Sequence, residues 1–485
     1  MKNKKIIITI LAITSFTVTS CKKFLETEPF NQTGKNTLFE TVEGAKMAMS
    51  GVYNRTLEYY KQDFAMYGDV TSDNLLRNPK TVTMLNQFNF QNSTSDDALA
   101  VGDIWLNIYA TLNNTNNIIA ALPGLKSKFP EQVNTLDSIS GQALALRALF
   151  HFDLCRVYAQ SYNFTSNAAH DGIPIVLKTP SPGQLIPRNT VKEVYDQIIT
   201  DLTNALPLLQ KHANATAQTG MSYQAALALL SRVYLYKQDW TQCLNYANMV
   251  IADKRYQLAD PEGYLDAFLV TRPHNQTGTK VEVIFQLTSA GLPNDNTAIA
   301  TIFSSAAAEY SASAKLRNLF DSDDIRLTTM FNVSIKPDDT NFGKYITKKY
   351  ADGVISAVTP PAIQVVRLSE VYLNRAEALY NLQRYSEAAA DVQLISRRAH
   401  PDRPITVTAT GTELGRQIAD ERNRELCFEN HRFFDLSRHK ENITRGADCN
   451  ANTCLLIYPN NKFVLPIPNR ETQANTALKQ NPGFN

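Results

Sequence analysis

The segment 421–439, ERNRELCFENHRFFDLSRH, mixes charged and large apolar side chains so densely that it limits how the chain can fold. It holds four arginines and four acidic residues among leucines and phenylalanines. Because so dense a mixture cannot keep every charge in water, some charges must be buried, and a buried charge is tolerated only when it is paired. On a helix, Glu421 and Arg424 lie three residues apart, as do Arg422 and Glu425, so local pairing is available. The segment therefore predicts an ion-paired structural element.

The same acidic residues admit a second interpretation, as a catalytic pair of carboxylates. Arg432 and Arg438 flank Asp435 at a spacing of three residues on either side. Neighbouring guanidinium groups hold a carboxylate ionised, whereas acid catalysis needs a carboxyl group with a raised pKa. The sequence therefore favours the structural interpretation.

Two further segments follow one helical-hairpin template. Ser231 precedes Trp240 by nine positions, and Ala376 precedes Tyr385 by nine. A small residue lets two helices approach closely while the aromatic residue covers the turn, which is the pattern of tetratricopeptide repeats, although generic amphipathic hairpins give a similar one. Weaker helical pairs extend the pattern: residues 44–61 with 101–121, and residues 140–158 with 191–209.

A repeat of this kind cannot bury its apolar face alone, so we expect one mostly α-helical domain over residues 36–485. Between the third and fourth repeats lies a loop-rich insertion, residues 256–361, without a sustained helical period. Within it, alternating and β-branched residues predict short strands at 281–287 and 344–350. The four repeats are expected at about 44–121, 140–209, 221–254 and 365–399.

The start of the chain predicts export. Lysines at positions 2, 4 and 5 precede an apolar run of thirteen residues, 6–18, which is too short for a hydrocarbon core of about 30 Å. Residues 1–20 are therefore expected to be a cleaved signal peptide, although an incidental cysteine after an ordinary signal would look similar. Small residues precede Cys21, whose thiol would accept a diacylglyceryl group, and residues 21–35 would form a tether. Lipid would then be the sole membrane attachment.

The motif ER-x-REL-x-FE-x-x-R-(aromatic)-x-DL-x-R over residues 421–438 is followed by FVLPIP at 463–468 and QNPGF at 480–484. Together with DIW at 103–105 and VRLSEVYLNRAEA at 366–378, these motifs resemble the SusD/RagB-like outer-membrane lipoproteins, and the resemblance runs from Cys21 to Asn485. It implies four helical repeats on one side of a single domain. It also implies that the protein binds a nutrient glycan without cleaving it and delivers it to a SusC-like TonB-dependent transporter.

Three alternatives to this function remain open: a surface glycoside hydrolase on a helical scaffold, a repeat scaffold that binds only protein partners, and a carrier of peptide cargo. The chain lacks HExxH, GxSxG, P-loop and GxGxxG motifs, so we expect no enzyme activity, cofactor or metal. The carboxylate pair of a glycosidase, however, has no sequence signature. A formal net charge of +2 without a basic run beyond the signal argues against nucleic-acid binding.

Sugar recognition needs aromatic faces and planar polar side chains, which commonly lie on loops beside a rigid scaffold. Two loop groups supply such side chains, although for each of them an ordinary solvated loop residue is the commoner explanation. Trp105 and Trp240 lie in helical patterns and are expected in the core. The candidate ligand contacts are Tyr67, Asp73, Asn74 and Arg77 in the first group, and Arg272, His274, Asn275, Asn294 and Asn296 in the second.

The cysteines after Cys21 fall into two kinds. Cys155, Cys243 and Cys427 lie in apolar helical patterns and are expected to fill the core. Cys449 and Cys454 flank a polar loop, so an oxidising compartment makes a local disulfide plausible. A half metal site is the alternative, but no nearby Cys or His supplies its other half.

Overall fold

The structure is a computed structural model, and its described residues begin at Leu38 and end at Phe484. The described ranges are 38–95, 100–211, 218–268, 281–288, 298–304, 307–333, 335, 338–350 and 362–484.

Long helices form most of the fold, as the sequence predicts. The longer ones are α3 (Val42–Tyr59), α6 (Ala100–Lys128), α7 (Val133–Tyr158), α8 (Val191–Gln210), α9 (Tyr223–Lys237), α10 (Trp240–Ile251), α14 (Leu368–Asn381), α15 (Tyr385–Ala399) and α16 (Gly411–Leu426). The shorter ones are α4 (Ala65–Val70), α5 (Leu85–Phe88), α11 (Ala298–Ser304), α12 (Ala314–Arg317), α13 (Ile325–Thr329), α17 (Arg432–Arg438) and α18 (Asn469–Ala474), with a π-helical turn η2 (Tyr60–Phe64) and 3-10 turns η3 (Pro130–Gln132), η4 (Ser166–Ala168), η5 (Tyr264–Phe268) and η6 (Asn461–Phe463).

Short strands pair in antiparallel twos, within the insertion and beside it. The pairs are β1 (Leu75–Arg77) with β3 (Tyr310–Ala312), β2 (Val283–Leu287) with β6 (Ile363–Arg367), β4 (Phe331–Val333) with β5 (Tyr345–Thr347), and β7 (Ile443–Thr444) with β8 (Leu455–Leu456). Strands β2 and β5 fall inside the two segments predicted as strands. The predicted mostly α-helical fold with a few short strands is therefore confirmed.

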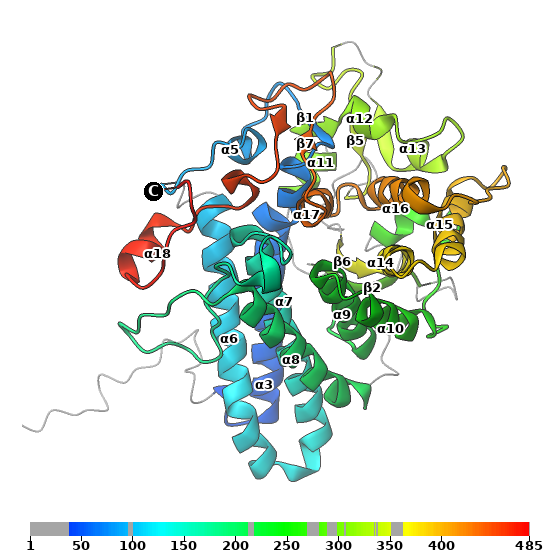
Figure 1. Ribbon diagram of the computed structural model, residues 1–485. Helices are drawn as coiled ribbons and strands as arrows, with labels where there is room; N and C mark the ends of the chain where they lie inside the picture. Colours follow the sequence, from blue (N-terminus) through cyan, green and yellow to red (C-terminus); the bar gives the residue numbers. More distant parts are fainter. Residues whose placement is uncertain are drawn as a thin grey trace, which may run out of the picture.

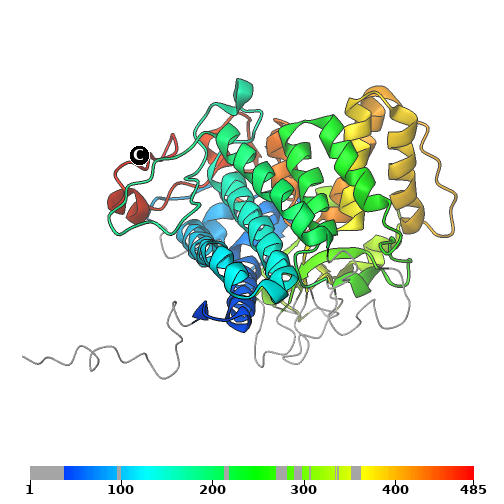
Figure 2. The ribbon, with the colours of Figure 1, turned by 90° about the horizontal axis from the view of Figure 1, so that it is seen from below.

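The helices stack in chain order. Helix α3 packs on α6, α7 on α8, α9 on α10, and α14 on α15, and each pair also contacts the next. Figure 2 shows the helices following one another in a row from α6 (cyan) to α15 (yellow to orange). The insertion elements α11, α12, α13 and β5 lie together at the top of Figure 1, with β1 and β7 beside them. No helix in the described part of the chain is both long and apolar enough to cross a membrane.

Small side chains sit where successive hairpins meet. Ser231 and Ala376 are fully buried, and the Asn374 amide donates a hydrogen bond of 3.2 Å to the Ser231 hydroxyl. Trp240 and Tyr385 start the second helix of their hairpins and pack partly buried against the core. The spacing of nine residues thus places a close helix contact and a covered turn in both hairpins.

Other expectations about the core are met. Trp105 is buried beside Tyr109 and Tyr158. The three cysteines that were expected as core fillers are unpaired and buried: Cys155, Cys243 and Cys427.

The segment 421–439 contributes acids to a buried ionic network. Glu425 accepts from Arg367 at 2.6 Å, from Arg326 at 2.9 Å, and from Arg398. Burial opposes the ionisation of Glu425, but the three guanidinium groups and Lys349 hold its pKa well below the usual range. The buried members are Glu282, Asp324, Glu421, Glu425 and Glu429 with Arg326, Lys349, Arg367 and Arg398, and we call this set the carboxylate–arginine network.

The predicted local pairing is partly wrong. Glu421 does pair with Arg424 at 2.6 Å, and Asp435 pairs with Arg438 at 2.9 Å. Arg422, however, bonds Asp435 at 2.8 Å instead of Glu425. Glu425 instead has Arg326, Arg367 and Arg398 as partners, which come from other elements of the fold.

We expect Glu425→Gln to destabilise the fold strongly. Removing one partner of a buried ionic cluster leaves the other charges uncompensated, and the loss of unfolding free energy should be about 3–5 kcal/mol. Urea unfolding of the purified protein at pH 7 measures this change. The matched control is Glu413→Gln on the same helix, where Glu413 makes an exposed pair with Arg416 at 2.6 Å. That control should lose little stability, because exposed ion pairs contribute little, and an equal loss in both variants would contradict a structural role for the network.

Candidate functional site

Short strands and loops gather at one end of the molecule (Figure 1, around β1, β7 and α12). Strand β1 pairs with β3, with Arg77 opposite Tyr310. Tyr310 and the strand interior are buried, whereas Arg77 is exposed at the end of β1. Arg77 is thus the candidate ligand contact that the structure places on a surface.

The loop between Cys449 and Cys454 supports Arg77. The two cysteines are joined by a disulfide. Asn450 in this loop donates to the Arg77 carbonyl at 2.7 Å and accepts from the Arg77 amide at 3.1 Å. The Arg77 Nε donates to the Asn450 carbonyl at 3.1 Å, so the side chain leaves the strand in a fixed direction.

Phe342 adds an aromatic face at the same end. Its side chain is 53% exposed, and no other aromatic side chain in the described ranges is classed as exposed. The amides of Asn78 and Asn341 both donate to the Ala308 carbonyl, at 2.8 and 3.3 Å, so the segments that carry Arg77 and Phe342 are tied together. We call the surface that carries Arg77 and Phe342 the aromatic–arginine face.

Tight turns hold Phe342 at a tip. Its backbone amide donates to Asp339 at 3.0 Å, and Lys344 donates to Asn341 at 2.9 Å. Gly343 follows with a φ of +70°, a conformation that favours glycine. The ring therefore projects from a constrained loop.

Three predicted ligand contacts are corrected by the structure. Tyr67, Asp73 and Asn74 were expected on an exposed loop, but each is 1% exposed. The Tyr67 ring lies in the core, with its centroid 5.4 Å from Phe433 and 6.0 Å from Phe434. A ring covered on this scale has no face free for a sugar.

Asp73 and Asn74 are occupied by the C-terminal segment. Arg432 donates to Asp73 at 2.7 and 3.0 Å, and Lys315 donates to it at 2.7 Å. Asn74 exchanges two amide hydrogen bonds with Asn423, at 2.8 and 3.2 Å. These polar side chains join distant parts of the chain, and because they are buried they are not available to a ligand at the surface.

The remaining candidates lie outside the described residues. Two of them belong to the segment just before Ala298, where α11 begins, and α11 packs against β3. The candidates concerned are Arg272, His274, Asn275, Asn294, Asn296 and Cys21, the residue predicted to carry the lipid.

A concave surface lies between α3 and α6. Phe39, Met47 and Ile118 give it apolar walls, and asparagine side chains line it. Met47 is 57% exposed there. The groove offers a rival location for a small ligand, on the helical stack instead of the loop end.

One group in the described ranges has the residue types of a metal site: Asp321, Asp323 and His400. The sequence analysis did not bring them together, because about 80 residues separate the aspartates from the histidine. They lie apart from the aromatic–arginine face, and their chemistry is considered below.

Two family models match the chain. One, described as starch-binding and associating with the outer membrane, matches residues 23–235, and the SusD family model matches residues 332–484. The chain is 25% identical to SusD-like protein P2 of Formosa agariphila, over 100% of both chains.

Solved structures show the same fold. A SusD superfamily protein from Bacteroides thetaiotaomicron has a TM-score of 0.81 and 25% identity, covering 91% of this chain and 100% of that chain. A SusD superfamily protein from Bacteroides vulgatus has a TM-score of 0.78 and 26% identity, covering 92% and 99%.

The ionic contacts of Asp73 predict an acid-sensitive contribution to stability. Burial raises the pKa of Asp73, but Arg432 and Lys315 more than offset this and lower the pKa from 3.8 to about 2. Because the folded pKa lies below the unfolded one, the contribution is present above pH 3.8 and is lost as the pH falls through 2. Asp73→Asn should therefore lose roughly 2 kcal/mol at pH 7.

Denaturant unfolding from pH 7 down to pH 2 tests this expectation. The stability curves of the wild type and Asp73→Asn should converge between about pH 4 and pH 2. Asp402→Asn, at an exposed position, should follow the wild type throughout. A constant gap between the wild type and Asp73→Asn down to pH 2 would refute the role of the ionised carboxylate.

Proposed function

Since the chain belongs to the SusD/RagB-like family of outer-membrane-associated proteins, we propose that it binds a nutrient oligosaccharide reversibly through the aromatic–arginine face. Starch-like α-glucans are the first class to test, because the model that matches residues 23–235 is described as starch-binding. The cargo would pass intact to a SusC-like TonB-dependent transporter.

The exposed Phe342 and the exposed Arg77, on segments joined at the Ala308 carbonyl, carry the proposal. A pyranose presents C–H patches that pack on an aromatic face and hydroxyl groups that accept hydrogen bonds from a guanidinium. Phe342 and Arg77 supply these two partners from segments joined at the Ala308 carbonyl. Both are held by hydrogen bonds to the fold, so little conformational entropy is lost on binding.

The groove between α3 and α6 is the rival binding surface. It contains an aromatic residue, Phe39, and several asparagines, which also suit a sugar. It lacks a fully exposed ring, however, since Phe39 packs partly buried against the core. We therefore place the ligand on the aromatic–arginine face, and a substitution in the groove serves as a comparison.

One observation favours hydrolysis as a second function. Burial and the nearby Asp103 raise the pKa of Asp63 to about 6, a value suited to a general acid. Glu421, Glu425 and Asp435 do not share this property, because their arginine partners lower the pKa of each carboxyl group. Asp69 has a pKa raised to about 7 by burial, but it is fully buried and accepts from the amides of Phe428 and Asn430. If soluble starch releases products with the wild type but not with Asp63→Asn, the protein is a hydrolase.

We expect Phe342→Ala and Arg77→Ala to weaken glycan binding without altering stability. Sites on exposed faces bury little area, so affinity should be roughly micromolar to millimolar. Loss of a stacking ring should cost about 1–3 kcal/mol of binding free energy. Migration in native gels cast with soluble starch, and with a panel of other polysaccharides, measures the loss of retention.

Two control variants sharpen this experiment. Leu394→Ala removes an apolar side chain that is 41% exposed on α15, far from the proposed face in sequence, and should keep full retention. Met47→Ala alters the α3–α6 groove and should also keep it. Retention lost in Met47→Ala and kept in Phe342→Ala would move the site to the groove. Absence of retention on every polysaccharide would count against glycan binding itself.

The anchor is proposed at Cys21, which directly follows small residues at the end of the apolar run. Cys21→Ala should remove the diacylglyceryl attachment and release the protein from the membrane. Fractionation of cells, with blotting of membrane and soluble fractions, measures the shift. A Cys155→Ala variant is the control and should remain in the membrane. Outer-membrane retention of Cys21→Ala would disprove the lipid anchor.

A further inference from the structure

His400, which follows the last residue of α15, is a buried imidazole with one unsatisfied nitrogen. Its side chain is 6% exposed, and its Nε2 has no hydrogen-bond partner. Its Nδ1 lies 2.8 Å from the Ser396 carbonyl oxygen. Because a carbonyl only accepts, Nδ1 carries the proton in the neutral ring, and Nε2 is left with a lone pair.

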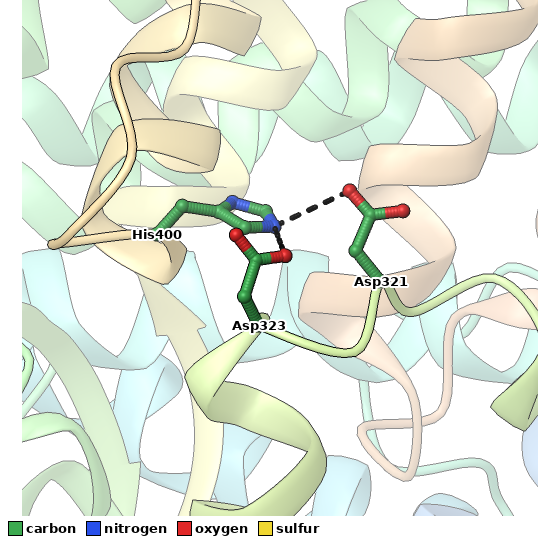
Figure 3. A group of neighbouring side chains, drawn as sticks. All are labelled: Asp321, Asp323 and His400. Carbon is green, nitrogen blue, oxygen red and sulfur yellow. Dashed lines mark ion pairs between the residues drawn. The ribbon is translucent and has the colours of Figure 1, made fainter.

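That lone pair faces two carboxylates (Figure 3). Nε2 lies 3.5 Å from Oδ2 of Asp321 and 3.8 Å from Oδ1 of Asp323. A lone pair directed at anionic oxygens is repulsive unless a proton or a metal ion lies between them. In a tetrahedral zinc site, ligands at 2.0–2.1 Å from the metal lie about 3.4 Å apart. The three side chains are thus close to the spacing that a metal ion requires.

We propose that Asp321, Asp323 and His400 bind a divalent transition-metal ion of the Zn²⁺ type. An imidazole nitrogen favours Zn²⁺ or Co²⁺ over Ca²⁺ and Mg²⁺, which prefer oxygen ligands. Three protein ligands leave at least one position for water. Asp321 is 62% exposed and Asp323 46%, so the ion enters from solvent on the side opposite the buried ring.

Arg403 supports the two carboxylates. Its guanidinium bonds Asp321 at 2.6 Å and Asp323 at 2.6 and 3.0 Å. Each carboxylate oxygen has more than one lone pair, so these bonds persist when the metal binds and orient the ligands. The positive charge of Arg403 opposes the metal, so affinity is expected in about the micromolar range.

The ion would join two parts of the fold. Asp321 and Asp323 lie between α12 and α13 in the insertion, and His400 ends the last hairpin of the helical stack. A metal at this position pins the insertion to the repeats beside the carboxylate–arginine network. Its role is structural support at a site separate from the proposed glycan face.

Metal titration of the chelator-treated mature protein tests the proposal. Calorimetry with ZnCl₂ should show one equivalent bound, and CoCl₂ should give visible absorption bands of a nitrogen–oxygen site. His400→Asn and Asp321→Asn should each weaken Zn²⁺ binding by at least about tenfold. Asp402→Asn removes the same charge from an exposed position nearby in sequence and should bind like the wild type.

Asp321→Asn also separates a loss of metal binding from a loss of folding. Asp321 is largely exposed, and circular dichroism should show wild-type helicity in Asp321→Asn. Failure of Zn²⁺ and Co²⁺ to bind would overturn the proposal and leave His400 as an imidazolium paired with the two aspartates. Binding of Ca²⁺ alone, or equal Zn²⁺ affinity in His400→Asn and the wild type, would overturn it as well.

Discussion

The fold depends on a buried cluster of opposite charges that joins the insertion to the helical repeats. Glu425 on α16 receives arginines from α13, from the end of β6 and from α15. Glu282, just before β2, bonds Arg367 at 2.6 Å and Arg398 at 2.8 Å. The insertion needs such contacts, because its described strands pair in twos and an isolated pair is marginal in water. Removing a single member leaves its partners as buried, unpaired charges, which strongly destabilises the fold.

The helical hairpins can be predicted from the sequence. For the buried ionic network, the sequence predicts that charges must pair but not which residues pair. Ser231, Ala376 and their aromatic partners reveal the hairpins, because helix periodicity and turn covering are local properties. The sequence also shows that segment 421–439 must pair its charges. It does not show the partners, because Arg326 lies 99 positions from Glu425 and any of the chain's arginines satisfies the same rule. Local spacing therefore predicted the pair Glu421–Arg424 correctly and Arg422–Glu425 wrongly.

The candidate site shows the same limit more sharply. Tyr67, Asp73 and Asn74 have the composition of a solvated loop, and they are buried because the C-terminal segment folds over them with Arg432 and Asn423. Phe342 carried no signal, since one aromatic residue between an asparagine and a glycine has neither a helical nor a strand period. His400 and Asp321 meet through tertiary packing alone. Exposure is set by what covers a residue, and that information is distant in sequence.

Rigidity links the interior to the proposed surface. A weak sugar site gains affinity when its groups need no ordering on binding, and a loop tip meets this condition only if its base is fixed. Here the base of the aromatic–arginine face is fixed by the β1–β3 pair, by the disulfide-closed loop that grips Arg77, and by the shared carbonyl of Ala308. Tyr350, at the end of the same insertion segment as Phe342, donates a hydrogen bond to the Phe428 carbonyl beside the ionic network. The insertion segment that carries the exposed Phe342 is therefore joined to the buried carboxylate–arginine network. Substitutions at exposed loop residues could then change the proposed ligand specificity while this network stays the same.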